Sequence, residues 1–285
     1  MSGAVLVDGL SKSYGDVEAV RGISFEIGTG EVFGLLGPNG AGKTTTVEVL
    51  EGYRARDAGN VQVLGVDPAS AGGAWRQRIG VVLQSGSMYG QLTVAESLTL
   101  FAGYYEQSRD VGEVISLVGL EEKRDALVRT LSGGQKRRLD LGLALVGDPE
   151  LVFLDEPTTG FDPEARRRAW ETIRSLRELG KTILLTTHYL DEAERLCDRV
   201  AVLRDGQIAA LGKPRELAGA GALPPTEIRY RRNGEEVVVH TEEPTRLLHE
   251  LTAQALADGR ELEALEVRRP SLEEVYLSLT REGAE

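Results

Sequence analysis

The residues with the clearest chemical potential form a phosphate-loop pattern, G-x-x-x-x-G-K-[ST]. They are Gly37, Pro38, Asn39, Gly40, Ala41, Gly42, Lys43, Thr44, Thr45 and Thr46. Glycines allow such a loop to turn with its N–H groups inward, so that a polyphosphate can approach the backbone without Cβ atoms in the way. Lys43 would reach the β- and γ-phosphates, and the Thr44 hydroxyl would hold Mg²⁺. The pattern predicts a bound nucleotide, with a glycine-rich turn of no special function as the alternative.

The stretches on either side of the loop agree with this prediction. Residues 31–36 are typical of a buried strand and residues 45–50 of a helix. The order strand, loop, helix presents the positive end of the helix to a bound anion.

Two acids end a second apolar run. Residues 151–154 are continuously hydrophobic and are followed by Asp155 and Glu156. Such a run predicts a strand buried on both faces, and ligands of parallel sheets bind outside the carboxyl ends of the strands. Asp155 therefore suits the Mg²⁺ shell, and Glu156 suits the attacking water as general base or orienting group. A simple strand end would explain Pro157 but not the acid pair.

Two other polar residues follow strand-like runs. Gln84 could touch Mg²⁺ or the attacking water, although by itself it is simply a loop residue. His188 could donate to the γ-phosphate and help to position Glu156. The remaining histidines, His240 and His249, lie in a charged tail and are expected at the surface.

A second anion site is predicted at the start of another helix. Ser132 and Gln135 fit a capping box, S-x-x-Q, which needs no ligand. The intervening Gly133 and Gly134 argue against that reading alone, because caps do not require them and they cost helix stability. Ser132 and the amides of the two glycines could bind an anion.

Short β-rich runs between residues 4 and 36 imply an antiparallel sheet ahead of the phosphate loop. Tyr14 lies in a turn of this region, and its ring could stack on adenine, a contact worth about 1–3 kcal/mol in nucleic-acid binders. A half-exposed turn residue is the default interpretation of a lone tyrosine.

The order of apolar runs along the chain predicts a main domain over 1–217. A change to helical periodicity predicts an inserted helical part at about 85–147. Residues 218–225 are small or proline and are typical of a linker. A small lobe over 226–285 follows. It is expected to hold a hairpin with its turn at 233–234, a helix at 244–257, a strand at 262–268 and a second helix at 271–280.

Composition narrows the function classes. The chain has 285 residues, a net charge of −12 and a pI near 5.0, which argues against nucleic acid as a partner because a phosphate backbone would be repelled. Cys197 is the only cysteine, so no internal disulfide can form. Residues 1–8 do not resemble a secretory signal, and no apolar run approaches the ~18 residues that span a bilayer.

Together these motifs resemble the ATP-binding subunits of ABC transporters. The similarity covers residues 4–217, and the LSGGQ signature at 131–135 is highly specific to that family. The resemblance assigns roles to single residues in this sequence. It implies adenine stacking by Tyr14, a Walker A loop at 37–45, a Q-loop glutamine at Gln84, a Walker B end at Asp155 and Glu156, a D-loop at Asp162 and a switch histidine at His188. Phe161 stands in the D-loop where the family usually has leucine.

The resemblance also implies a fold and a mode of action. The fold is α/β, a P-loop NTPase of the ABC type with an N-terminal antiparallel β subdomain, an inserted helical subdomain and a small α+β C-terminal lobe. ATP and Mg²⁺ are the expected cofactors. The two anion sites are explained by a head-to-tail homodimer, in which the signature of one copy covers the γ-phosphate held by the other.

Subfamily motifs at 158–163 and 187–193, and more loosely at 269–276, resemble bacterial ABC-2 type exporters, including drug-resistance pumps. The subunit would then lie peripherally on the cytoplasmic side of the cell membrane and dock on a separate integral membrane permease. A soluble ABC protein acting on ribosomes stays open as an alternative, although such proteins usually carry two cassettes. DNA-repair ATPases of this type place a long coiled coil between the nucleotide motifs, which is missing between Gln84 and Leu131.

Overall fold

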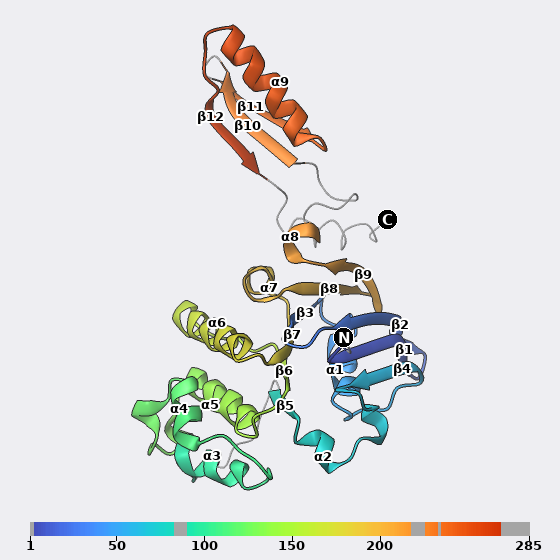
Figure 1. Cartoon of the computed structure of the whole chain (residues 1–285), viewed down its shortest axis with the longest axis vertical. Coiled ribbons are helices and arrows are strands. Elements are labelled where there is room, and N and C mark those ends of the chain that lie inside the picture. The colour runs from blue at the N-terminus through green and yellow to red at the C-terminus, as the bar shows by residue number, and fades with distance from the viewer. Residues whose placement is uncertain (1–2, 83–89, 218–225, 233–234, 269–285) are drawn as a thin grey trace. The chain divides into compact units, whose positions relative to one another are not determined.

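The computed structural model describes residues 3–82, 90–217, 226–232 and 235–268. It divides the chain into two compact units, Met1–Leu211 and Gly212–Glu285 (Figure 1). The sequence placed the boundary a few residues later, at 217, and the predicted linker lies outside the described residues. The assignment of these units as domains stays a prediction.

The first unit is built on a six-stranded sheet of order β5-β6-β7-β3-β8-β9, whose strands are labelled in Figure 1. Neighbouring strands from β5 to β8 pair in parallel. All residues of β3 and β7 are buried, including the threonines of β7, as in parallel strands that are covered on both faces. The strands span Val32–Leu36 (β3), Ile79–Val82 (β5), Leu151–Asp155 (β6), Thr182–Thr187 (β7), Arg199–Arg204 (β8) and Gln207–Gly212 (β9).

A second sheet of the first unit is antiparallel, with order β2-β1-β4. The sequence assigned the run ending at Leu36 to this sheet, which is wrong, because that run is β3 of the parallel sheet. Its place is taken by β4, which follows the phosphate-loop helix along the chain. The strands span Val5–Tyr14 (β1), Val17–Ile27 (β2) and Ala58–Val63 (β4).

The main core lies between the two sheets and includes helix α1 (Lys43–Leu50). Phe25 of β2 stacks on Phe33 of β3, with ring centroids 5.3 Å apart. Val47 and Leu50 of α1 are buried in the same cluster. This packing holds the helix, and with it the phosphate loop, against the carboxyl end of β3.

The other helices of this unit include a separate group, α3 to α5, which Figure 1 shows together at one end of the unit. Their contacts with one another and of α5 with β5 agree with an inserted helical part. The helices span Gly73–Arg76 (α2), Val94–Ala102 (α3), Val111–Leu117 (α4), Gly133–Leu145 (α5), Pro163–Glu178 (α6) and Leu190–Leu196 (α7). Short 3-10 turns span Pro68–Ser70 (η1), Glu121–Lys123 (η2) and Val128–Thr130 (η3).

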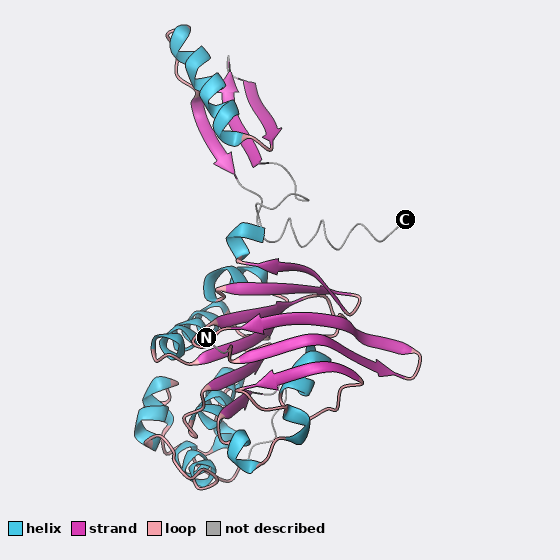
Figure 2. Ribbon diagram, turned by 45° about the vertical axis from the view of Figure 1, so that its right-hand side comes forward, coloured by secondary structure: helices cyan, strands magenta, loops and turns pink. Residues whose placement is uncertain are grey.

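The second unit contains an antiparallel sheet of order β11-β10-β12, with α9 lying along it in both views (Figures 1 and 2). Ile228 and Tyr230 of β10 form its buried centre. The expected helix at 244–257 and strand at 262–268 are present. The expected turn at 233–234 and helix at 271–280 lie outside the described residues. The elements span Pro214–Leu217 (α8), Thr226–Arg232 (β10), Glu235–Thr241 (β11), Pro244–Ala257 (α9) and Glu263–Arg268 (β12).

Candidate functional site

The predicted phosphate loop joins β3 to α1 and is held in a conformation that needs glycine. Gly42 is the N-cap of α1 with φ 99°, and a Cβ there would lie 2.4 Å from the Ala19 carbonyl oxygen. A Cβ at Gly37 would lie 2.5 Å from the Leu203 carbonyl oxygen. Among the described residues no side chain caps the N-terminus of α1. The first amides of this helix are therefore suited to an anion supplied from outside the chain.

Lys43 is buried in the loop, with 6% of its surface exposed. Its ammonium donates to the carbonyl oxygens of Gly37, at 2.7 Å, and Pro38, at 3.0 Å. Burial lowers the pKa of Lys43, and the negative charges of Glu156 and Asp155 oppose that shift. Lys43 is thus within electrostatic reach of Asp155 and Glu156.

The acid pair lies at the carboxyl end of β6, as the sequence predicts, and β7 is a neighbouring strand. Asp155 lies opposite Thr186 in the sheet, and the Thr186 hydroxyl donates to Asp155 Oδ1 at 2.5 Å. The Glu156 backbone N–H donates to the same hydroxyl oxygen at 3.0 Å. One threonine therefore sets the position of both acids.

The conformation of Glu156 is unusual for a residue other than glycine, with φ 46°. Arg137 of α5 donates to the carbonyl oxygens of Asp155, at 3.2 Å, and Glu156, at 3.3 Å. These contacts and the Thr186 contact hold the backbone in this sparsely populated region, which occurs at functional sites more often than elsewhere.

The side chain of Glu156 meets His188, as the sequence predicts. His188 Nδ1 lies 3.3 Å from Glu156 Oε1, and the Thr159 hydroxyl donates to Glu156 Oε2 at 3.0 Å. The carboxylate is 13% exposed and the imidazole 39% exposed, so the pair opens to solvent on the histidine side. The other two histidines, His240 and His249, are exposed, as expected.

The predicted second anion site is the start of α5, and it is capped by the chain itself. The Ser132 hydroxyl oxygen accepts from the Gln135 N–H at 3.3 Å, and the Ser132 N–H donates to Gln135 Oε1 at 2.9 Å. These two bonds form the capping box that the sequence predicts as the alternative to an anion site. Neither glycine between them has a positive φ.

Tyr14 is the last residue of β1 and not a turn residue, because β1 and β2 continue further than their apolar runs. The residue is 41% exposed. Arg54 Cζ lies 5.1 Å and Lys12 Nζ 5.7 Å from the ring centroid. Both cations lie over the ring, so the aromatic face on which a base would stack is in contact with charged side chains. Gln84, the remaining predicted site residue, lies outside the described residues.

A cavity of about 830 Å³ has Thr44 and Asp155 in its lining. A hydroxyl and a carboxylate are hard oxygen donors of the kind that Mg²⁺ prefers, with substrate phosphates completing its shell. Glu51, at the C-terminal end of α1, also lines the cavity. Burial and the charges of Asp155 and Glu48 raise its pKa to about 8.

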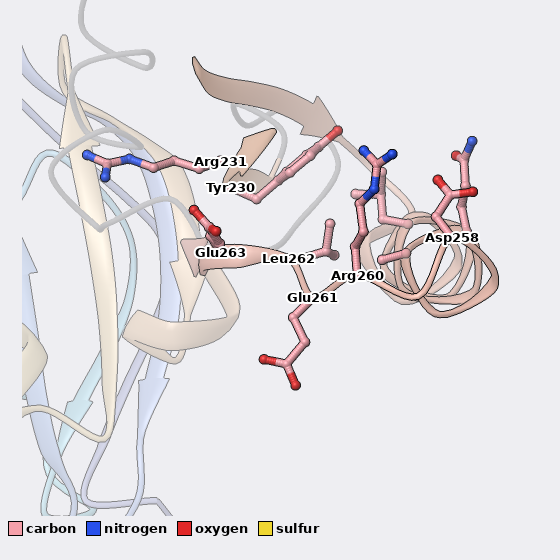
Figure 3. Close-up of a pocket in the computed structure, with 10 residues that line it drawn as sticks. Tyr230, Arg231, Asp258, Arg260, Glu261, Leu262 and Glu263 are labelled. Atoms are coloured by element: carbon pink, nitrogen blue, oxygen red, sulfur yellow. The ribbon is translucent and has the colours of Figure 1, made fainter. Parts of the chain in front are cut away.

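Another cavity, of about 560 Å³, lies in the second unit between α9 and the strands (Figure 3). Figure 3 shows Tyr230 reaching toward the side on which Arg260 and Asp258 lie, while Arg231 and Glu261 point away. It contains none of the residues that the sequence assigned to nucleotide chemistry.

Comparison with known proteins covers both units. Residues 20–159 match the family described as ABC transporter, and residues 215–271 match an ABC transporter domain-containing protein-like C-terminal domain. Nod factor export ATP-binding protein I of Rhizobium meliloti (strain 1021) is 42% identical over 300 residues, which cover 97% of this chain and 88% of the relative. The chain belongs to the ATP-binding subunits of ABC transporters.

Solved structures agree with this membership. A chain described as the ATP-binding subunit of an ABC transporter superposes with a TM-score of 0.73 at 25% identity, covering 98% of this subunit and all of that chain. CbiO1 of Clostridium perfringens, described as part of an ABC transporter complex, superposes with a TM-score of 0.67 at 27% identity over 76% of this subunit and 91% of its own length. The ABC ATPase fold expected from the sequence is confirmed.

Three residues of this ABC subunit take part in the site although the sequence did not single them out. Thr186 connects the two acids, Thr159 contacts Glu156, and Arg137 binds the backbone of both acids. A polar residue inside an apolar strand, such as Thr186, is the one available signal in the sequence. Among the described residues, no helix has the length and apolar character needed to span a membrane.

Proposed function

We propose that this subunit hydrolyses ATP at the phosphate loop and that the hydrolysis drives export through a separate membrane permease. The observation that carries the proposal is the contact of Glu156 Oε1 with His188 Nδ1 at 3.3 Å, beside the buried Lys43. A carboxylate oriented by an imidazole next to a phosphate-binding lysine is suited to water attack on a terminal phosphate.

The chain's own groups supply most of the step. Amides at the start of α1 and the Lys43 ammonium hold the β- and γ-phosphates. Glu156 accepts a proton from a water molecule as the water oxygen bonds to the γ-phosphorus, and the bond to the ADP oxygen breaks with its electron pair on ADP. His188 orients Glu156 and donates toward the γ-phosphate. Thr44 and Asp155 would hold Mg²⁺, which neutralises phosphate charge when bound.

The start of α5 supports a composite site between two copies. Ser132 and the amides of Gly133 and Gly134 would contact the γ-phosphate bound to the partner copy. Because the bridging charge is lost on hydrolysis, the two copies would separate and the reaction would become a mechanical movement. A cassette solved as a dimer with ADP and phosphate superposes on 73% of this chain with a TM-score of 0.66, which supports the fold that this arrangement needs.

Export as the direction of transport is supported by the relatives, whose names describe Nod factor export. The subunit would lie on the cytoplasmic side of the membrane, bound to an integral permease. In host lysate, the tagged chain should sediment with membranes. Sedimentation with ribosomes instead would favour the alternative of a ribosome-directed ATPase.

The Glu156→Gln variant tests the catalytic proposal. It keeps the size of the side chain and its contact with Thr159 but removes the base, so kcat should fall by about 10²- to 10⁴-fold. Binding of radiolabelled ATP should be retained, and an ATP-dependent dimer should accumulate in size-exclusion chromatography. Glu178→Gln makes the same chemical change on an exposed part of α6 and should leave turnover unchanged. Wild-type turnover by Glu156→Gln would refute the assigned role.

A further inference from the structure

The buried carboxyl of Glu192 has no part in the mechanism above. It belongs to α7, and none of its surface is exposed. Its Oε1 accepts two hydrogen bonds, from the Thr158 hydroxyl at 2.9 Å and from the Trp170 indole N–H at 3.0 Å. The carboxyl therefore connects three segments: α7, the turn after β6, and α6.

The positions of these contacts along the chain relate them to the catalytic pair. Thr158 follows Glu156 by two residues in the same turn, and Glu192 follows His188 by four residues. Because Glu156 and His188 meet at 3.3 Å, the contact between Glu192 and Thr158 is a second connection between the same two segments. Two connections fix the orientation of the segments, whereas one would leave them free to rotate about the contact.

Trp170, which donates to Glu192, is itself in contact with two arginine side chains. Arg166 and Arg195 lie over its ring, with Cζ 5.5 Å and 5.3 Å from the centroid. Arg166 also lies 5.4 Å from the ring centroid of Tyr189, whose ring is 4.1 Å from that of His188. Trp170 is thus fixed by stacking as well as by its bond to Glu192.

The carboxyl acts here as a hydrogen-bond acceptor. Burial raises the pKa of Glu192, and hydrogen bonds from the side chains of Thr187, Trp170 and Thr158 oppose that shift. An amide of the same size can provide the same acceptor oxygen, which makes the contact testable by substitution.

We propose that Glu192 is a positioning residue, which holds the turn bearing Glu156 and the segment bearing His188 at the separation that hydrolysis requires. An apolar side chain would fill the same volume, but it would leave the Thr158 hydroxyl and the Trp170 N–H unpaired. The inference rests on the proposed function, because it assigns Glu192 a role in the reaction of Glu156 and His188.

The test compares Glu192→Leu, Glu192→Gln and Thr158→Val in the full chain. In Glu192→Leu, kcat should fall about 10- to 100-fold, as expected for displaced catalytic groups, while KM for ATP changes less than about twofold. Glu192→Gln should restore kcat to within about threefold of wild type. Thr158→Val removes one of the two hydrogen-bond donors to Glu192 Oε1, and its kcat should lie between those of Glu192→Leu and Glu192→Gln. Thermal unfolding of each variant checks that the comparison is made on folded protein.

A second measurement separates positioning from general structural support. In a Glu156→Gln background, single-turnover hydrolysis of radiolabelled ATP should show little further loss on adding Glu192→Leu, because the geometry it protects is no longer used. A variant that merely weakens the fold would reduce the rate in both backgrounds.

Several outcomes would overturn the inference: unchanged kcat in Glu192→Leu and Thr158→Val, a Gln variant no better than the Leu variant, or equal losses in both backgrounds. If Glu192→Leu does not fold, Glu192→Gln and Thr158→Val still decide, since wild-type turnover in Thr158→Val or a Gln variant impaired tenfold contradicts the proposal. Failure of Glu156→Gln to slow turnover would refute the proposed function itself, whereas loss in Glu156→Gln with none in the Glu192 variants refutes only this inference.

Discussion

The helices α1 and α5 both begin at glycine-rich segments, but their starts are built differently. At α1, Gly37 and Gly42 are required by the chain itself, since a Cβ at either would collide with a backbone oxygen. At α5, a Cβ at Gly133 would meet no described atom within 4 Å, and one at Gly134 would meet only Ala165 Cβ at 3.8 Å. The fold of the chain therefore requires glycine at the start of α1, but it does not require glycine at the start of α5.

Capping shows the same difference. Among the described residues, no side chain caps α1, whereas α5 is capped by its own Ser132 and Gln135. The start of α1 can therefore bind an anion within one copy of the chain. The start of α5 is complete by itself, and its bare glycines allow another molecule to approach closely. This difference predicts that substitutions at the two helix starts will have different effects on ATP affinity and on turnover.

The largest expected effect is at the start of α5. Gly134→Asp places a carboxylate where the partner's γ-phosphate would lie, so turnover should fall more than about 100-fold through charge repulsion. The affinity of a single copy for ATP should change less than about twofold, because α1 is untouched. Phosphate release and equilibrium dialysis of ATP measure the two quantities.

Gly134→Ala is the matched control for this position. It adds a methyl group that the folded chain accommodates, and it should stabilise α5 by up to about 1 kcal/mol. If Gly134→Asp lost as much ATP affinity as turnover, the proposed difference between the two helix starts would be contradicted.

The next effect is at the start of α1. Lys43→Ala removes the charged donor of the loop, and the affinity for ATP should fall about 10- to 100-fold, the value of a hydrogen bond to a charged group. Lys213→Ala removes an exposed lysine and should leave the affinity unchanged. ATP titration with both variants would sharpen the comparison, and equal affinities would contradict it.

The smallest effect is at the opposite end of α1. Because the folded pKa of Glu51 is about 8 and its ordinary value is 4.5, the folded chain retains a proton that the unfolded chain releases. Stability due to this group is complete below about pH 4.5 and is lost as the pH rises toward 8. Glu51→Gln should therefore raise the free energy of unfolding by about 1–2 kcal/mol at pH 8 after allowance for solvent screening, and by little at pH 5.

Urea unfolding at the two pH values measures this gain. Glu178→Gln, the same chemical change on an exposed part of α6, is the matched control. An equal effect of Glu51→Gln at pH 5 and pH 8 would show that the substitution acts through packing and not through the proton.

Local patterns in the sequence predicted most of the fold and the segments that form the site. Strand ends following apolar runs placed Asp155 and His188 correctly, because buried parallel strands bring their carboxyl ends to one edge. The sheet that contains β3 could not be predicted, since a short apolar run fits either sheet. The contacts of Thr186 and of Glu192 join residues that are distant in sequence or in different segments, and no periodicity reports such pairs.

The left-handed backbone at Glu156 limits how this position can change during evolution. The backbone there favours Gly, Asn or Asp, whereas the contact with His188 needs a side chain as long as that of Glu. Asp would suit the backbone better but would withdraw the carboxylate by one methylene, and branched residues would suit neither demand. The residue present is thus a compromise between the backbone conformation and the length that the contact with His188 requires.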